Sequence, residues 1–227
     1  MRWTLCAAMV LAVAGLGFAA WAGEEEWKPQ GDGWVQLFNG KDLTGWKFRG
    51  KENTSWKAED GILANIKPEE KGKRGVDIFT EPKFYNFELH IEFKVPKGGN
   101  SGVYLRGRKE IQVADSFGRE KPGPGDCGGI YSKAGAAVNA CRPVGEWNTF
   151  DIKVDGDKIT VVHNGKVIHD NVEFRGATGG ALDGDDTKPG SLLLQGDHSS
   201  VWYRNIWIKP LPGGPEEAKK EEPKTEK

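Results

Sequence analysis

Apolar and polar residues alternate along much of the chain, which is the pattern of β-strands with one buried face. In the clearest run, residues 87–95, five apolar side chains alternate with Glu88, His90, Glu92 and Lys94. Shorter runs of the same kind predict further strands at 34–38, 55–58, 62–66, 103–106, 147–154, 158–163, 166–169, 192–195 and 201–208. No segment sustains a helical period. About ten strands predict an all-β protein, a two-sheet antiparallel β-sandwich of the jelly-roll type.

The joints between these strands carry strong turn signals. Asn39-Gly40, Asp60-Gly61, Asp155-Gly156 and Asn164-Gly165 are each typical of a β-hairpin. Three longer irregular segments, 67–75, 117–129 and 176–190, are expected to be loops at the rims of the sheets. Loops of that length often carry function.

The two ends differ in composition from the middle. Residues 1–22 have a basic start, a short apolar run and small residues at Ala20 and Ala22, which is typical of a secretory signal peptide. Residues 23–30 are expected to be a linker, 31–211 a single domain, and 212–227 a disordered charged tail whose loss leaves fold and activity unchanged. The chain is therefore predicted to be exported, secreted or periplasmic, with no stable membrane span once the signal is removed.

Charge and aromatic content narrow the range of molecules that the protein is expected to bind. The chain has 32 Lys and Arg against 33 Asp and Glu, a formal net charge of −1. This balance argues against a surface for nucleic acid or anionic membrane. Seven of the nine tryptophans follow the signal segment, and indole faces serve either as core or as platforms for sugar rings.

Removal of the signal would leave Cys127 and Cys141 as the only cysteines of an exported chain. They are expected to form a disulfide that holds residues 128–140 over one edge of a sheet. The alternative is two free buried thiols. No metal is expected there, because the sequence lacks a second cysteine pair or a spaced histidine pair. The three histidines on regular strand patterns or turns are expected at the surface: His90, His163 and His169.

A polar row stands out at residues 110–115. In a strand, Ile111 and Val113 face one side, while Glu110 and Gln112 face the other. Asp115 has the wrong parity for that polar face and joins it only if a bulge inserts one residue. Carboxylates held on a rigid strand suit acid–base work on sugars. The alternative is the exposed face of an antiparallel sheet.

Further candidates surround this row. Arg106 precedes it and could bind sugar hydroxyls or neutralise a carboxylate, and Asn100 and Ser101 open the same strand. Gln195 leaves an apolar strand, and His198 lies just after it, where a histidine is well placed for proton transfer. The alternative for His198 is a loop histidine bonded to the backbone. The remaining candidates lie inside the expected disulfide loop, which could close over a substrate or be solvated: Tyr131 and Lys133. The acidic residues Asp183, Asp185 and Asp186 do not match a calcium loop and are expected to form a solvated turn.

Four separated segments appear in a recognisable order: GWVQLFNGKDLTGW, YNFELHIEFKVPKGGNSGVYLRGRKEIQVADS, EWNTFDIKVDGDKITVVHNGKVI and LLLQGDHSSVWYRNIWIKPL. Over about residues 33–211 the chain resembles the 3-keto-disaccharide hydrolase domain family. The resemblance implies a concanavalin-like lectin/glucanase jelly roll and an activity on glycosides oxidised to a ketone at carbon three. Glu110, Gln112 and Asp115 also resemble a degenerate form of the E-x-D-x-x-E strand of laminarinase-type glucanases. Because the central acid is Gln here, retaining hydrolysis by that trio does not follow.

The leading hypothesis is a secreted enzyme that cleaves 3-keto-glycosides by hydrolysis or by elimination and hydration. Its catalytic candidates are Glu110, His198 and Asp115. Its substrate-binding candidates are Arg106, Gln112, Gln195, Asn100, Ser101, Tyr131 and Lys133. No cofactor is required, and a divalent metal is compatible with the chemistry. The alternatives are a non-catalytic carbohydrate-binding module and a cell-envelope structural domain.

Overall fold

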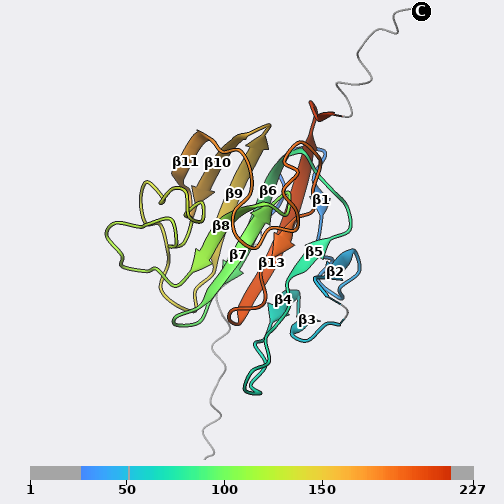
Figure 1. Cartoon of the computed structure of the whole chain (residues 1–227), viewed down its shortest axis with the longest axis vertical. Helices are drawn as coiled ribbons and strands as arrows, with labels where there is room; N and C mark the ends of the chain where they lie inside the picture. Colours follow the sequence, from blue (N-terminus) through green and yellow to red (C-terminus); the bar gives the residue numbers. More distant parts are fainter. Residues whose placement is uncertain (1–26, 51, 216–227) are drawn as a thin grey trace, which may run out of the picture.

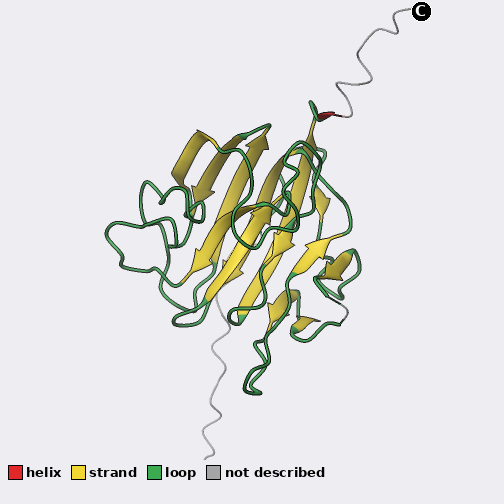
Figure 2. Cartoon of the chain, viewed as in Figure 1, coloured by secondary structure: helices red, strands yellow, loops and turns green. Residues whose placement is uncertain are grey.

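The structure is a computed structural model that describes residues 27–50 and 52–215. Two antiparallel sheets pack face to face, and all thirteen named elements are strands (Figures 1 and 2). The predicted all-β sandwich is therefore confirmed. The predicted signal peptide and nearly all of the predicted tail lie outside the described residues. Within the described ranges there is no helix with the length and apolar character needed to cross a membrane.

The larger sheet has eight strands. Its order is β11-β10-β9-β6-β13-β4-β3, and β1 pairs with β13. The strands are β1 (Val35–Gln36), β3 (Trp56–Glu59), β4 (Ile62–Asn65), β6 (Asn86–Lys94), β9 (Asn148–Asp155), β10 (Lys158–His163), β11 (Lys166–Glu173) and β13 (Val201–Leu211).

The smaller sheet has five strands in the order β2-β5-β12-β7-β8. They are β2 (Trp46–Phe48), β5 (Ile78–Thr80), β7 (Asn100–Leu105), β8 (Lys109–Ala114) and β12 (Leu193–Leu194). The register of β7 against β8 is regular from Asn100↔Ala114 to Leu105↔Lys109. This hairpin forms one end of the smaller sheet and carries the polar row noted in the sequence.

The core fills the space between the sheets. On β6, Leu89, Ile91 and Phe93 are at most 1% exposed, and Val103 and Ile111 of the smaller sheet are fully buried. Burying side chains of this size stabilises the fold by about 1.5–3 kcal/mol each. The alternation along β7 and β8 thus sends one row into the core and leaves the other row on the outer face of the smaller sheet.

Three of the four predicted hairpins are confirmed. Asp60-Gly61 joins β3 to β4, Gly156 follows Asp155 between β9 and β10, and Asn164-Gly165 joins β10 to β11. Asp60 and Asn164 have φ of 50° and 48°, the left-handed conformation that such tight turns require. Asn39-Gly40 does not form a hairpin, because β1 pairs with β13 while the following strand β2 joins the other sheet.

The expectation of surface histidines is wrong. His90, His163 and His169 are 1%, 0% and 5% exposed. The Trp27 ring covers His90, with ring centroids 3.9 Å apart, and the Gly128 carbonyl accepts a hydrogen bond from His169 Nε2 at 2.8 Å. His163 shares the inward row of β10 with Ile159 and Val161. Alternation in the sequence shows which side chains share a face of a strand. It does not show whether another segment of the chain covers that face.

Candidate functional site

A cleft of about 270 Å³ opens on the outer face of the smaller sheet. Strands β7 and β8 form its floor, and the segment that follows β12 forms one wall. The loop at residues 176–190 contributes another wall through Gly179 and Gly180. The lining residues are Arg49, Asp77, Asn100, Tyr104, Glu110, Gln112, Tyr131, Gly179, Gly180, Gln195, Asp197 and His198.

The register of β7 against β8 brings the polar side chains of the cleft floor onto one face. Tyr104 pairs with Glu110 and Gly102 pairs with Gln112, so these side chains share the outer face. The Glu110 side chain lies across Gly102, where an added Cβ would come within 2.3 Å of Glu110 Oε1. A glycine at this position therefore makes the room that the carboxyl group occupies.

Glu110 is buried at the centre of this floor, with 2% of its surface exposed. Tyr104 Oη donates a hydrogen bond to Glu110 Oε2 at 2.8 Å. With its amide oriented to satisfy its neighbours, Gln112 Nε2 donates to Glu110 Oε1 at 2.8 Å and to the Ser101 carbonyl at 3.1 Å. Both carboxylate oxygens are thus held in a fixed orientation.

Burial raises the pKa of Glu110 to about 7. The hydrogen bond from Tyr104 acts in the opposite direction, and the negative charges of Asp77 and Asp197 raise the pKa further. A carboxyl group with this pKa exchanges its proton near neutral pH. This is the property of a general base or acid in a catalytic site.

The raised pKa also predicts how stability depends on pH. The folded protein holds the Glu110 proton more tightly than the unfolded chain, whose carboxyl has a pKa near 4.5, so this group's contribution to stability falls as pH rises from 4.5 to about 7. Glu110→Gln is therefore expected to be about 3 kcal/mol more stable than wild type at pH 8. Urea unfolding at pH 8 and pH 4 checks this, because the difference should vanish at pH 4. A difference in stability between the two proteins that is the same at pH 8 and pH 4 would contradict the raised pKa of Glu110.

A second carboxylate, Asp77, lies at the wall beside β5. Burial raises its pKa, and the charge of Asp197 adds to the shift, whereas hydrogen bonds from Gly196 and Arg49 oppose it. The Gly196 amide donates to Asp77 Oδ1 at 3.0 Å, and Arg49 Nη1 lies 3.3 Å from Oδ2. Arg49 also donates to the carbonyls of Gly180 at 2.5 Å and Ala181 at 3.0 Å. This one guanidinium therefore joins the loop at residues 176–190 to the sheet.

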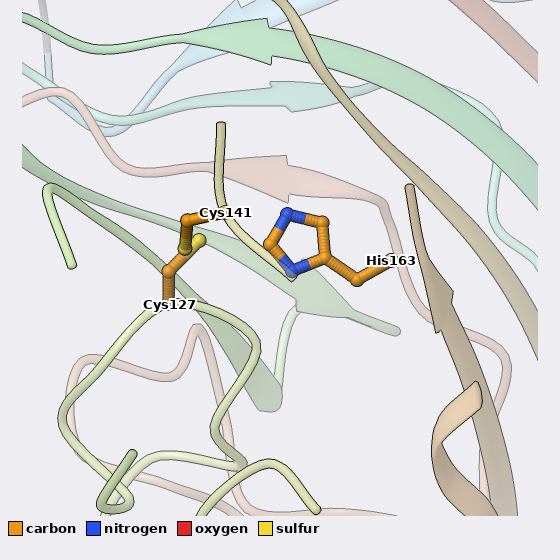
Figure 3. Close-up of side chains that lie close together, drawn as sticks. All are labelled: Cys127, Cys141 and His163. Carbon is orange, nitrogen blue, oxygen red and sulfur yellow. The ribbon is translucent and has the colours of Figure 1, made fainter. Parts of the chain in front are cut away.

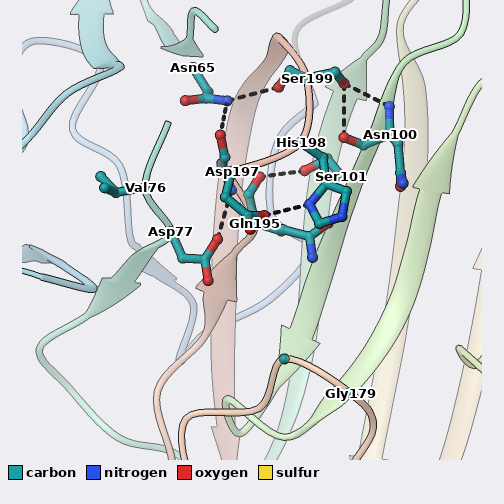
Figure 4. A network of polar contacts seen from close by, with 12 residues as sticks. Asn65, Val76, Asp77, Asn100, Ser101, Gly179, Gln195, Asp197, His198 and Ser199 are labelled. Carbon is teal, nitrogen blue, oxygen red and sulfur yellow. Dashed lines mark hydrogen bonds and ion pairs between the residues drawn. The ribbon is translucent and has the colours of Figure 1, made fainter. Parts of the chain in front are cut away.

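The segment after β12 brings an imidazole to the cleft (Figure 4). The backbone N–H of Gln195 anchors the start of this segment by donating to the Gly102 carbonyl at 2.9 Å. His198 Nδ1 bonds to Asp197 Oδ1, and the His198 side chain is 46% exposed. Because the carboxylate accepts the Nδ1 proton, Nε2 is the nitrogen that is available to exchange a proton with a ligand.

Of the predicted site residues, the cleft brings together Glu110, His198, Gln112, Gln195, Asn100 and Tyr131. Arg106 was expected among them and is not there. Its φ of 53° starts the turn after β7, which takes it out of the strand alternation. Its buried guanidinium packs over the Tyr85 ring at 4.6 Å, bonds to the Gly156 carbonyl and lies 3.8 Å from Asp186.

Three other candidates also lie elsewhere. Ser101 faces the interior, where Oγ donates to the Gln195 carbonyl at 2.7 Å and lies 2.8 Å from Tyr203 Oη. Because β8 has no bulge, Asp115 keeps the wrong parity, and its Oδ2 accepts the Gly98 amide proton at 2.9 Å. Lys133 is exposed, with Nζ 5.7 Å from the centre of the Phe174 ring.

The acidic segment at residues 183–186 has a structural role that the sequence did not reveal. Asp183 Oδ1 lies 2.6 Å from Arg108 Nε, and Asp186 Oδ2 lies 2.8 Å from the buried Lys109 Nζ. The Asp185 carboxylate accepts from Thr187 and pairs with Lys188. These carboxylates therefore neutralise cations of the β7–β8 hairpin and of their own loop.

The predicted disulfide is not present. Cys127 and Cys141 are free thiols, although they lie side by side (Figure 3). The expected position of the enclosed loop is correct, because the Gln112 amide donates to the Gly129 carbonyl at 2.9 Å along the edge of β8. Among the described residues, these thiols and His163 form the only group of three potential metal-ligand atoms within 4.8 Å of one another. The carboxylates of the cleft form no such group in that part of the chain.

Besides Gly179 and Gly180, sequence reasoning missed four residues that line the cleft: Arg49, Asp77, Tyr104 and Asp197. Tyr104 could have been found, since it shares the parity of Asn100 on the same strand. Asp197 adjoins the predicted His198. Arg49 follows β2 and Asp77 precedes β5, two short strands that no pattern in the sequence predicted.

The comparisons with known proteins bear on the family and the fold. Residues 33–209 match the model of the 3-keto-alpha-glucoside-1,2-lyase-like domain. A 3-keto-disaccharide hydrolase of Bacteroides thetaiotaomicron is 28% identical over 79% of this chain and 79% of its own length.

Two crystal structures from Parabacteroides distasonis, each described as a "putative glycosyl hydrolase", share the fold. One is 28% identical with a TM-score of 0.64 and matches 89% of this chain and 100% of its own. The other is 30% identical with a TM-score of 0.60 and matches 79% of this chain and 100% of its own. These relatives support a glycoside-processing function. Since the family model covers most of the chain, the protein belongs to the family of 3-keto-alpha-glucoside-1,2-lyase-like domains.

Proposed function

We propose that this protein cleaves the glycosidic bond of 3-keto-glycosides, with Glu110 as the base that removes the proton from carbon two. The observation that carries the proposal is the buried Glu110 carboxyl, whose pKa is raised to about 7 in a cleft rich in hydrogen-bond donors. The family match and the Bacteroides relative support the same substrate class.

The ketone explains why a base suffices for bond cleavage. A carbonyl at carbon three acidifies the proton on carbon two, and its removal leaves an enolate. The enolate electrons then form the double bond between carbons one and two, while the glycosidic oxygen leaves carbon one and takes a proton. Addition of water to the resulting enone gives the free 3-keto sugar, so that the sum of both steps is hydrolysis. The cleavage step needs a base, a donor for the enolate oxygen and an acid for the leaving group.

The cleft supplies a group for each of these roles. Tyr104 and Gln112 hold the Glu110 carboxylate in place through their hydrogen bonds. His198, oriented by Asp197, protonates the leaving oxygen through Nε2. The amides of Asn100 and Gln195 and the guanidinium of Arg49 provide donors for sugar hydroxyls and the enolate oxygen; all three residues line the cleft.

Tyr104 offers a test of the role of its hydrogen bond. Because that bond lowers the pKa of Glu110, Tyr104→Phe is expected to raise the pKa of Glu110 and to shift the rising limb of the pH–rate profile to higher pH. The variant Tyr85→Phe, which changes a tyrosine outside the lining residues, is the matched control. An unshifted profile for Tyr104→Phe would show that Tyr104 does not tune the base.

A carbohydrate-binding module without activity is the competing function, and it would use aromatic stacking. No tryptophan lies among the lining residues of the cleft. Instead Trp202 lies on β13 of the larger sheet and Trp147 immediately precedes β9, with Lys94 Nζ 5.5 Å and 4.9 Å from their ring centres. The raised pKa of Glu110 is typical of a proton-transfer group, which favours catalysis over binding alone.

Incubating the purified protein with 3-keto-glucosides and with the matching unoxidised glucosides tests the proposal. We expect release of the aglycone from the ketone alone, because only the ketone makes the carbon-two proton removable. Binding of the 3-keto-glucoside without release would support the carbohydrate-binding module. Equal turnover of both substrates would indicate conventional glycoside hydrolysis.

We also propose that the chain is exported, on the strength of the signal-like residues 1–22. Expression of the full chain in a bacterial host should give a periplasmic product that lacks this segment. N-terminal sequencing of a cytoplasmic product that still begins at Met1 would contradict export.

A further inference from the structure

A second cluster of reactive side chains lies apart from the lining residues of the cleft. Cys127, Cys141 and His163 come from three separate segments, and their sulfur and nitrogen atoms all lie within 4.8 Å of one another (Figure 3). Cys127 and Cys141 flank the loop that borders β8, and His163 ends β10. The fold therefore builds a two-sulfur, one-nitrogen group that sequence spacing conceals.

Hydrogen bonds determine which nitrogen of His163 is free. His163 Nε2 lies 3.2 Å from Asn148 Oδ1. The same oxygen accepts from the Arg142 amide at 2.9 Å and from Asn164 Nδ2 at 2.8 Å, so it is fixed as an acceptor. Nε2 must then carry the proton, which leaves a lone pair on Nδ1.

This lone pair is an unusual feature of a buried residue. His163 is 0% exposed, and its Nδ1 has no hydrogen-bond partner among the described residues. Burial, with a smaller contribution from Arg142, lowers the pKa of His163 to about 4, so the imidazole is neutral at physiological pH. A neutral imidazole whose second nitrogen is held by a hydrogen bond is the usual arrangement of a metal-ligating histidine.

The two thiols are also held in place. The Cys127 amide donates to Ser116 Oγ at 3.0 Å, and the Cys141 amide donates to Asn139 Oδ1 at 3.0 Å. Cys127 is 2% exposed, whereas Cys141 is only partly buried and leaves a route from solvent. The site is thus formed before any ligand arrives, and one side of it is accessible.

We propose that Cys127 Sγ, Cys141 Sγ and His163 Nδ1 bind one thiophilic cation, Zn²⁺ or Cu⁺. Thiolate and imidazole are the ligands these ions prefer, whereas Mg²⁺ and Ca²⁺ require oxygen ligands. Bonds of about 2.3 Å to sulfur and 2.0–2.1 Å to nitrogen would draw the three atoms slightly together. Binding releases both thiol protons to solvent, and the Asn148 hydrogen bond to Nε2 orients the ring. The ion would tie β10 to the loop that carries Tyr131 into the wall of the cleft.

A titration of the reduced protein without residues 1–22, which contain a third cysteine, tests the site under anaerobic conditions. With ZnCl₂ or with Cu⁺ in acetonitrile we expect uptake of a single equivalent, protection of Cys127 and Cys141 from alkylation, and a rise in melting temperature of roughly 5–10 °C at saturation. Co²⁺ should give a thiolate-to-cobalt charge-transfer band. Tighter binding of Zn²⁺ or of Cu⁺ in competition identifies which ion the site prefers.

Two histidine variants separate this site from a simple dithiol. His163→Gln should weaken binding of the ion at least tenfold and shift the spectrum of the Co²⁺ complex. His90→Gln, the matched control, changes a buried histidine that contacts Trp27 and Asp151 and should bind the ion as wild type does. Equal affinity of wild type and His163→Gln would overturn the proposed coordination. So would a reduced protein whose cysteines remain open to alkylation at saturating metal.

Discussion

Glu110→Gln is expected to lower the turnover of a 3-keto-glucoside by about two to four orders of magnitude, the range typical of a lost general base. Gln keeps the size of the side chain and an acceptor for Tyr104 Oη, which now donates to Glu110 at 2.8 Å. Substrate affinity should therefore fall much less than turnover. Steady-state kinetics together with calorimetric binding of the same substrate separates the two effects.

The matched control for this variant is Glu120→Gln, since Glu120 is exposed and does not line the cleft. It should retain wild-type kinetics. Turnover by Glu110→Gln within threefold of wild type would remove Glu110 from the mechanism. In wild type, the rate at low substrate concentration should rise with pH through about 7, because the base acts only when it is ionised.

His198→Ala is expected to have the second largest effect, and that effect should depend on the leaving group. If His198 protonates the departing oxygen, its loss should slow release of a poor leaving group, such as a sugar, by about 10²–10⁴-fold. Release of a nitrophenolate, which departs without a proton, should slow far less. Rates for the two aglycones, measured in both proteins, check this expectation.

Asp197→Asn provides the companion measurement for the imidazole. It removes the charge that holds His198 Nδ1 while keeping a side chain of the same size. An intermediate loss, with the same dependence on leaving group, is expected. A loss in His198→Ala that is equal for both aglycones would assign His198 to substrate binding rather than proton transfer.

Much of the fold could be predicted because alternation is a strong local signal. The long strand β6 and the three confirmed hairpin turns are examples. The short strands β2 and β5 have three residues each, too few to show a period. Their place in the smaller sheet is set by long-range pairing, which neighbouring residues do not encode.

The centre of the site could also be predicted, but its surroundings could not. Parity correctly put Glu110 and Gln112 together and correctly warned that Asp115 needed a bulge. Arg106 was misplaced because it adopts a positive φ as the strand ends, so alternation stops one residue earlier than expected. Arg49 and His163 take their roles from contacts with other segments of the chain. Arg49 donates to the Gly180 carbonyl, and His163 contacts Asn148.

The central claim is that cleavage begins with removal of the proton from carbon two by Glu110. A 3-keto-glucoside carrying deuterium at carbon two tests it most directly, through the rate and the label in the released sugar. The account predicts a primary isotope effect on cleavage and loss of deuterium to solvent, with cleavage and label loss both suppressed in Glu110→Gln. Cleavage without an isotope effect, and with all the deuterium retained in the sugar, would contradict it.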